Sequence, residues 1–212
     1  MTQPSEARKT VKAKQEFLYF IEARWTSFGS GIHCVNEREL FRDPLRGLTK
    51  SSLRLSREES SPMQAVPLMQ FSGKADKYHD DLEIIWGIWI MSPAVRAFFE
   101  RIDPGAFTFM ECRTQYPDGS TAPPRSLAVV IREVDAFDRE KSEFFTNPYN
   151  PEKNTAILSV LNRNYFRKSA VGSFHIFVAA RTSGEPVVSQ AVRDEFKKQR
   201  WRGATFAKAY LS

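Results

Sequence analysis

The side chains in this chain that could take part in acid–base or metal chemistry are few and stand apart. His33, His79 and His175 are the only histidines, and no two have the spacing that places a pair of imidazoles on one helix face. His79, beside Asp80 and Asp81, is the best candidate for a general base or a metal ligand, although a surface histidine next to two acids commonly forms only an ion pair. His175 lies in an apolar run and is interpreted as a hydrogen-bonded residue of a sheet. The histidines by themselves do not predict an active site.

The acidic and thiol side chains lead to the same conclusion. A cluster of carboxylates between residues 76 and 83 could bind a divalent cation, but it lacks the regular spacing of an EF-hand loop. Cys34 and Cys112 do not have a paired metal-binding spacing, and we expect them to be buried free thiols. The chain contains no glycine-rich nucleotide loop and no G-x-S-x-G nucleophile elbow. We therefore predict a protein that is not an enzyme, with no catalytic residues, no metal site and no cofactor.

A basic stretch near the end of the chain is better suited to binding than to catalysis. Residues 197–202 carry four basic side chains around Trp201. Arg and Trp are frequent hot spots of protein interfaces, and Arg and Lys also contact phosphate groups. The same composition is typical of a solvated helix end, where cations are favoured by the helix dipole. A protein-binding surface, a nucleic-acid-binding surface and an ordinary helix end all remain open.

Four residues are our candidates for contact with a partner: Tyr149, Tyr165, Arg200 and Trp201. We expect each of them in a loop or near the exposed end of a helix, where a partner can reach it. Changing Arg200 and Trp201 together to Ala should weaken capture of that partner.

Composition and charge limit the classes of protein to which the chain can belong. Its 212 residues include 17 Phe and 4 Trp, the apolar content of a globular protein, and they suffice for one large domain or two small ones. No apolar run approaches the roughly twenty residues that span a membrane, and residues 1–6 lack the pattern of a signal peptide. These features predict a cytoplasmic protein. The net charge of +6, with a pI of about 9.4, is modest and spread along the chain.

Two similar segments are expected to form the main helices. Met91–Phe99 and Val188–Phe196 both read apolar, Ser, any residue, Ala-Val-Arg, two residues, Phe. We predict that a strand ends at the apolar residue and that the hydroxyl group of Ser92 or Ser189 caps the following helix. Apolar residues then recur at helical spacing, which gives each helix one apolar face. A Gly-Ala pair follows each segment, and its glycine suits a left-handed helix cap before the next strand.

The rest of the chain predicts strands joined by turns. Strands are expected at residues 17–21, 106–113, 126–134 and 174–180. The turn Tyr116–Gly119 would join two of them as a hairpin. Pro67 cannot donate to a ladder, so 65–71 is expected at a sheet edge, and 82–91 is expected to hold a short helix or turn before a strand. The predicted fold class is α+β, with a largely antiparallel sheet and the two Ser-capped helices in a single compact protein.

A series of short motifs resembles a known bacterial family. The motifs occur at Met91–Glu100, Asp103–Gly105, Phe107–Phe109, Val134–Ser142, Phe174–Phe177, Val188–Ser189 and Gly203–Phe206. They cover about residues 80 to 208. In this order they resemble the eleventh-numbered immunity domain of polymorphic toxin systems, first described as a domain of unknown function. With this resemblance, the chain divides into a flexible basic arm at 1–14, a variable αβ part at 15–90 and the family core at 91–212.

The resemblance implies a small cytoplasmic bacterial protein that binds a toxin made by its own cell or by kin and blocks it. It implies no catalytic residues, and the mechanism would be occlusion of the active cleft of the toxin. Inhibitors of nucleases tend to be acidic because they imitate a phosphate backbone, whereas this chain is basic. We therefore expect a toxin whose binding face is acidic or neutral. The alternative is a nucleic-acid-binding module that uses the basic stretch at 197–202.

Overall fold

The computed structural model describes residues 17–23, 31–40, 64–73, 80–85, 87–146, 148, 155–159 and 162–212, which form an α+β protein. The largest sheet has the strand order β12 (Tyr165–Phe166), β15 (Ala204–Leu211), β1 (Phe17–Ala23), β14 (Pro186–Ser189), β13 (Ile176–Ala179) and β9 (Glu133–Val134). A second sheet has the order β4 (Leu82–Ile85), β5 (Ile88–Met91), β8 (Ser126–Val130) and β6 (Phe107–Glu111). Most neighbouring strands are antiparallel. The parallel pairs are β12–β15, β13–β9 and that of β3 (Leu68–Phe71) with β7 (Arg113–Gln115). The predicted fold class is confirmed.

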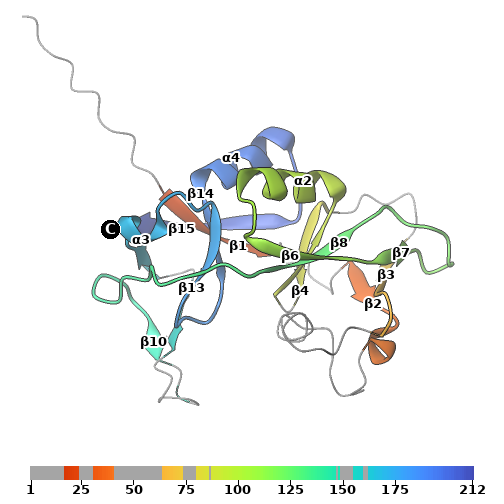
Figure 1. Cartoon of the computed structure of the whole chain (residues 1–212), viewed down its shortest axis with the longest axis horizontal. Coiled ribbons are helices and arrows are strands. Elements are labelled where there is room, and N and C mark those ends of the chain that lie inside the picture. Colours follow the sequence, from red (N-terminus) through yellow and green to blue (C-terminus); the bar gives the residue numbers. More distant parts are fainter. Residues whose placement is uncertain are drawn as a thin grey trace, which may run out of the picture.

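Two smaller sheets complete the described part of the chain. One contains β2 (Ile32–Cys34), β3 (Leu68–Phe71) and β7 (Arg113–Gln115), and the other pairs β10 (Phe145–Thr146) with β11 (Ala156–Ile157). The helices among the described residues are α2 (Pro93–Ile102), α3 (Lys168–Val171) and α4 (Gln190–Gln199), with a 3₁₀ turn at Glu37–Glu39. Figure 1 shows α2 and α4 side by side over the two larger sheets.

The two similar segments of the sequence form two units of the same topology. In each unit, the strands before and after the helix both lie antiparallel to one strand between them, β8 in the first unit and β1 in the second. Each unit also has a fourth strand, which forms a hairpin with the strand before the helix. This fourth strand is β4, paired with β5, in the first unit and β13, paired with β14, in the second. The orders are therefore β4-β5-β8-β6 and β13-β14-β1-β15. The second unit takes its middle strand from the other end of the chain.

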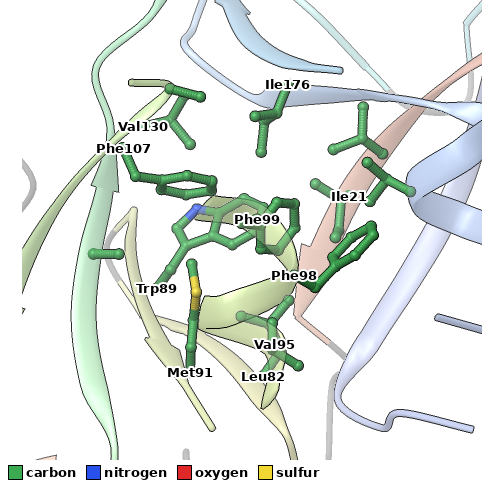
Figure 2. Close-up of a cluster of buried hydrophobic side chains, with 14 of the residues drawn as sticks. Ile21, Leu82, Trp89, Met91, Val95, Phe98, Phe99, Phe107, Val130 and Ile176 are labelled. Carbon is green, nitrogen blue, oxygen red and sulfur yellow. The ribbon is translucent and has the colours of Figure 1, made fainter. Parts of the chain in front are cut away.

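The two units share one core between their helices and sheets. Val95 of α2 and Val192 of α4 are completely buried, and the rings of Phe99 and Phe196 lie 6.2 Å apart across the helix pair. Figure 2 shows Phe99 with Trp89 and Phe107, whose ring centroids lie 5.0–5.6 Å from one another. The apolar face that the periodicity predicts for each helix is confirmed, and the structure shows that the two faces meet in one core.

Equivalent arginines link each helix to the middle strand of its unit. Arg96 of α2 donates to the hydroxyl group of Ser126 in β8, at 2.9 Å. Arg193 of α4 donates to the hydroxyl group of Tyr19 in β1, at 3.1 Å, and its guanidinium lies 4.6 Å from the centre of the Tyr19 ring. The Ala-Val-Arg triplet therefore supplies both a core residue and a strand contact in each unit.

The Ser caps differ between the two helices. The hydroxyl group of Ser92 accepts a bond from the backbone N–H of Val95, at 3.5 Å, as predicted. Ser189 occupies the same position before α4, but its side chain makes no cap bond. Its hydroxyl group lies 2.8 Å from Nδ1 of His175 instead. The prediction of a second Ser cap is wrong because His175, just before the neighbouring strand β13, offers this hydroxyl another partner.

Two predictions about strands also need correction. The 65–71 segment is not at a sheet edge, because β3 lies between β2 and β7, and Pro67 precedes the strand. The 82–91 segment forms its expected turn, at Gly87, and its expected strand, β5, but its first described residues form a further strand, β4, in place of a helix. The hairpin of β6 and β8, the turn at Tyr116–Gly119 and the strands β1 and β13 are confirmed.

Candidate functional site

The three histidines do not come together in the described part of the structure. The imidazole of His175 bonds Ser189, and its backbone N–H donates to the carboxylate of Asp103. The residue is hydrogen-bonded as expected, but it lies just before β13 and not within a strand. His33 is exposed on β2, and His79 lies outside the described residues. Among the residues that the structure describes, no group of three or more His, Cys, Asp or Glu could hold a metal ion.

The two cysteines are half-buried free thiols. Burial raises the pKa of Cys112 to about 12, and the nearby charge of Glu111 adds to this effect. Burial likewise raises the pKa of the Cys34 thiol. Each thiol donates a hydrogen bond, Cys112 to the carbonyl of Arg125 and Cys34 to Oδ1 of Asn36. Since the thiolate is the reactive form, both cysteines are poor nucleophiles at neutral pH.

Two ionisable side chains, the half-buried Glu83 and the buried Arg125, lie near the contact between β4 and β2. Burial and the charge of Asp80 raise the pKa of Glu83 to about 7, against the opposing effects of Arg125 and nearby backbone N–H groups. The guanidinium of Arg125 donates to the carbonyl of Asp80 at 3.0 Å and lies 5.3 Å from the ring centre of Phe71. These contacts join the four-stranded sheet to the three-stranded one, which is a structural role.

The candidate contact residues at the end of α4 differ in exposure. Arg200 is exposed and ends the helix in a left-handed conformation, with φ at 59°. Trp201 is half-buried, because its ring packs 5.5 Å from that of Phe98 and 5.2 Å from that of Phe196. Arg200 is therefore open to a partner, whereas much of Trp201 belongs to the shared core.

Tyr165 lies far from these two residues. It pairs with Tyr210 near the end of β15, whereas Arg200 and Trp201 precede the first residue of that strand. Tyr210 follows the first residue of β15, Ala204, by six residues, so the two groups are on the order of 20 Å apart. The structure does not bring the candidates into one patch. Tyr149 lies outside the described residues, in the connection between β10 and β11.

Tyr165 belongs to a row of aromatic side chains that crosses three strands. Tyr165 of β12 and Phe17 of β1 both pair with Tyr210 of β15. The Tyr165 and Tyr210 rings stack at 5.2 Å, and the Phe17 ring meets Tyr210 edge-on at 6.3 Å. All three side chains are half-buried. We call Tyr165, Tyr210 and Phe17 the aromatic row.

A lysine lies directly on this row. Lys208 is exposed, precedes Tyr210 by two residues in β15, and so points to the same face of the sheet. Its Nζ lies 3.6 Å from the centre of the Phe17 ring and 5.3 Å from that of Tyr210. Within the described part of the chain, no carboxylate lies within 4 Å of this ammonium group. Among the described residues, the row therefore presents a positive charge that lies on aromatic rings and has no carboxylate partner.

The chain matches one known protein family over most of its length. The family model described as "Immunity protein family (Imm11)" matches residues 18–210. The chain belongs to the Imm11 immunity protein family. No curated protein matches this Imm11 chain. The matched range begins at Leu18 and so includes most of β1, N-terminal to the segment from 80 to 208 that carries the resemblance. The division of the chain at residues 14 and 90 stays a prediction.

Sequence reasoning on this Imm11 protein missed Phe17, Lys208 and Tyr210. A signal was present, because Lys208 and Tyr210 alternate with small residues as expected for one face of a strand. The pairing of β15 with both β1 and β12 was not visible, since it joins segments that are far apart in the chain. In the part of the chain that the structure describes, no helix has the length and apolar composition needed to cross a bilayer.

Proposed function

We propose that this Imm11 protein binds a cognate bacterial toxin and neutralises it by occluding its active cleft. The observation that carries the proposal is the family match over residues 18–210. The protein would act in the cytoplasm of a bacterium that makes the toxin or meets it from kin. Inhibition by occlusion needs an interface of about 1,600 Å² in total, with a few aromatic and Arg anchors at its centre.

The contact residues we propose are Tyr149, Tyr165, Arg200 and Trp201. Tyr165 is supported by its place in the half-exposed aromatic row, and Arg200 by its exposure at the end of α4. For Trp201, truncation would also remove core contacts and cost on the order of 2 kcal/mol of folding free energy, less than for a fully buried Trp. Arg200→Gly is the cleaner variant, because glycine accepts the left-handed conformation that Arg200 adopts.

Co-expression tests the proposal. The product of the reading frame next to this gene is expressed alone and together with the chain, and growth and complex formation are measured. We expect growth arrest by the product alone, rescue by the chain, and co-purification of the two proteins. A product that stays toxic in the presence of folded chain, with no complex, would contradict the proposal.

Four exposed basic side chains, Lys197, Lys198, Arg200 and Arg202, support nucleic-acid binding as a second candidate function. One of them, Lys198, is engaged by Glu195 at 3.4 Å. Phosphate-driven binding weakens steeply with salt because counterions are released, whereas an anchored protein interface weakens less. A steep salt dependence of binding to duplex or single-stranded DNA would favour this second function.

A further inference from the structure

We propose that the aromatic row and Lys208 form the surface that recognises the toxin, and that they bind a segment carrying a carboxylate beside an apolar side chain. This inference rests on the proposed function and adds to it the chemistry of the partner. It also adds Lys208, Tyr210 and Phe17 to the contact residues. β1 and β15, which carry these three residues, lie side by side beneath α4 (Figure 1).

The charge of Lys208 sets the first requirement for the partner. Its Nζ is held 3.6 Å from the ring centre of Phe17, and such cation–π contacts fix a lysine side chain without neutralising it. The ammonium remains exposed and has no carboxylate within 4 Å among the described residues. A carboxylate from a partner would meet a positioned charge and form a charge-assisted hydrogen bond. Less side-chain entropy would be lost than for a mobile lysine.

Arg193, the cation next to Lys208, already has partners within the protein. Arg193 lies over the ring of Tyr19, the residue that pairs with Lys208 across β1 and β15. It donates to the Tyr19 hydroxyl group at 3.1 Å and lies 3.6 Å from a carboxylate oxygen of Asp194. Its charge is therefore partly compensated inside the protein. Lys208, which has no carboxylate within 4 Å among the described residues, is left for a partner.

The rings set the second requirement. Tyr165, Tyr210 and Phe17 are half-buried, so each keeps part of its apolar surface open while its neighbours hold it in place. Rigid tyrosines give a large contact area at a low cost in conformational entropy. An apolar side chain of the partner, next to its carboxylate, would cover this open surface.

The same geometry disfavours nucleic acid as the occupant. Proteins that bind single strands offer open ring faces on which bases stack. Here the ammonium group of Lys208 covers a face of Phe17, and Tyr165 and Tyr210 stack on each other at 5.2 Å. Few faces are left for a base. A protein segment that approaches Lys208 and the outer edges of the rings fits better.

Binding measurements on matched variants test the inference. The probe is the purified product of the neighbouring reading frame that the co-expression experiment uses, and the affinity is measured at 50 and 300 mM salt. Lys208→Met keeps the apolar stem on Phe17 and removes only the charge. Arg38→Met removes one positive charge at an exposed position in the 3₁₀ turn Glu37–Glu39, outside the proposed contact residues, and controls for net charge. We expect Lys208→Met to weaken binding about tenfold at low salt and to flatten the salt dependence, with Arg38→Met within about twofold of wild type.

Tyr165→Ala supplies the second arm, with its fold checked by circular dichroism. We expect it to weaken binding about tenfold at both salt concentrations, since its contact is apolar. If wild type binds the product and both Lys208→Met and Tyr165→Ala bind equally well, the inference is wrong while the proposed function stands. If wild type does not bind, both are wrong. Tighter binding of a thymidine 20-mer than of the product, lost in Lys208→Met, would also overturn the inference.

Discussion

The backbone of Gly203 packs directly against the carbonyl group of Leu82. A β-carbon at Gly203 would lie 1.8 Å from the carbonyl oxygen of Leu82 and 2.8 Å from Cβ of Asp80. Next to it, the carbonyl of Arg202 accepts bonds from the backbone N–H groups of Asp81 and Leu82, both at 3.2 Å. The segment after α4 is thus fastened to the start of β4, and the contact joins the two larger sheets.

This contact predicts that Gly203→Ala is severely destabilising. The added methyl group cannot fit without moving the backbone of β4, and φ at 98° is itself unfavourable for Ala. We expect a loss of at least about 4 kcal/mol in the free energy of unfolding, or failure to fold. Gly105→Ala is the matched control, because Gly105 also has positive φ, at 79°, but open space around it. It should cost about 1 kcal/mol in urea denaturation, and equal losses for the two variants would disprove the role of the contact.

Asp103 is predicted to be the carboxylate whose removal costs most at the end of α2. It accepts bonds from the backbone N–H groups of His175 and Ile176, at 2.7 and 2.9 Å, and it pairs with Arg132. Asp103→Ala should lower the free energy of unfolding by about 3 kcal/mol, since buried donors and a cation lose their acceptor. Asp135→Ala breaks an exposed pair with Arg167 and should cost less than about 1 kcal/mol. Similar losses in denaturant titrations would contradict this assignment.

Glu83 should make stability depend on pH. Its pKa is raised from 4.5 to about 7 in the folded chain, so the unfolded chain releases this proton at lower pH than the folded chain does. Below pH 4.5, Glu83 is protonated in both states and does not lower the free energy of unfolding. As the pH rises towards 7, the unfolded chain loses this proton first, and the free energy of unfolding falls by at most about 3 kcal/mol. Glu83→Gln carries no titrating proton and should escape this loss.

The measurement is the free energy of unfolding of both proteins between pH 4.5 and 8. Glu83→Gln should gain on wild type as the pH rises through this window and then keep a constant advantage. A difference between the two proteins that does not change with pH would show that Glu83 titrates normally.

Phe144 and Phe145 are adjacent but should behave differently. Phe144 is half-buried, and its ring packs edge-on against Phe137 at 5.6 Å, whereas Phe145 in β10 is 66% exposed. Phe144→Ala should cost about 2 kcal/mol of folding free energy, and Phe145→Ala less than about 0.5 kcal/mol. Thermal and urea denaturation of the two variants check this. A larger loss for Phe145→Ala would mean that its side chain is covered.

Local sequence patterns predicted the helices and the long strands well, because these elements are determined largely by residues close together in the chain. The apolar spacing after Ser92 and Ser189 gave both helices, and the turn at Tyr116–Gly119 gave the hairpin of β6 and β8. What failed depends on distant partners. Ser189 bonds His175 rather than its own helix, and β3 is a central strand although Pro67 precedes it.

The candidate site was only partly predictable for the same reason. Tyr165 was chosen from the sequence, but its neighbours Tyr210 and Phe17 come from the two ends of the described chain and meet only through the sheet. Gly203 was expected to cap α4, yet the left-handed residue at that helix end is Arg200. The Gly203 position requires glycine because another sheet lies against it, which no local pattern reveals.

If this Imm11 protein neutralises a toxin by binding and not by turnover, each chain should inhibit one toxin molecule. The most direct measurement is a titration of the activity of the purified toxin with increasing amounts of the chain, followed by mass spectrometry of the toxin. We predict that inhibition becomes complete at one chain per toxin, and that the toxin released from the complex is chemically unchanged and active. Inactivation by a small fraction of an equivalent, or a covalently altered toxin, would contradict the account.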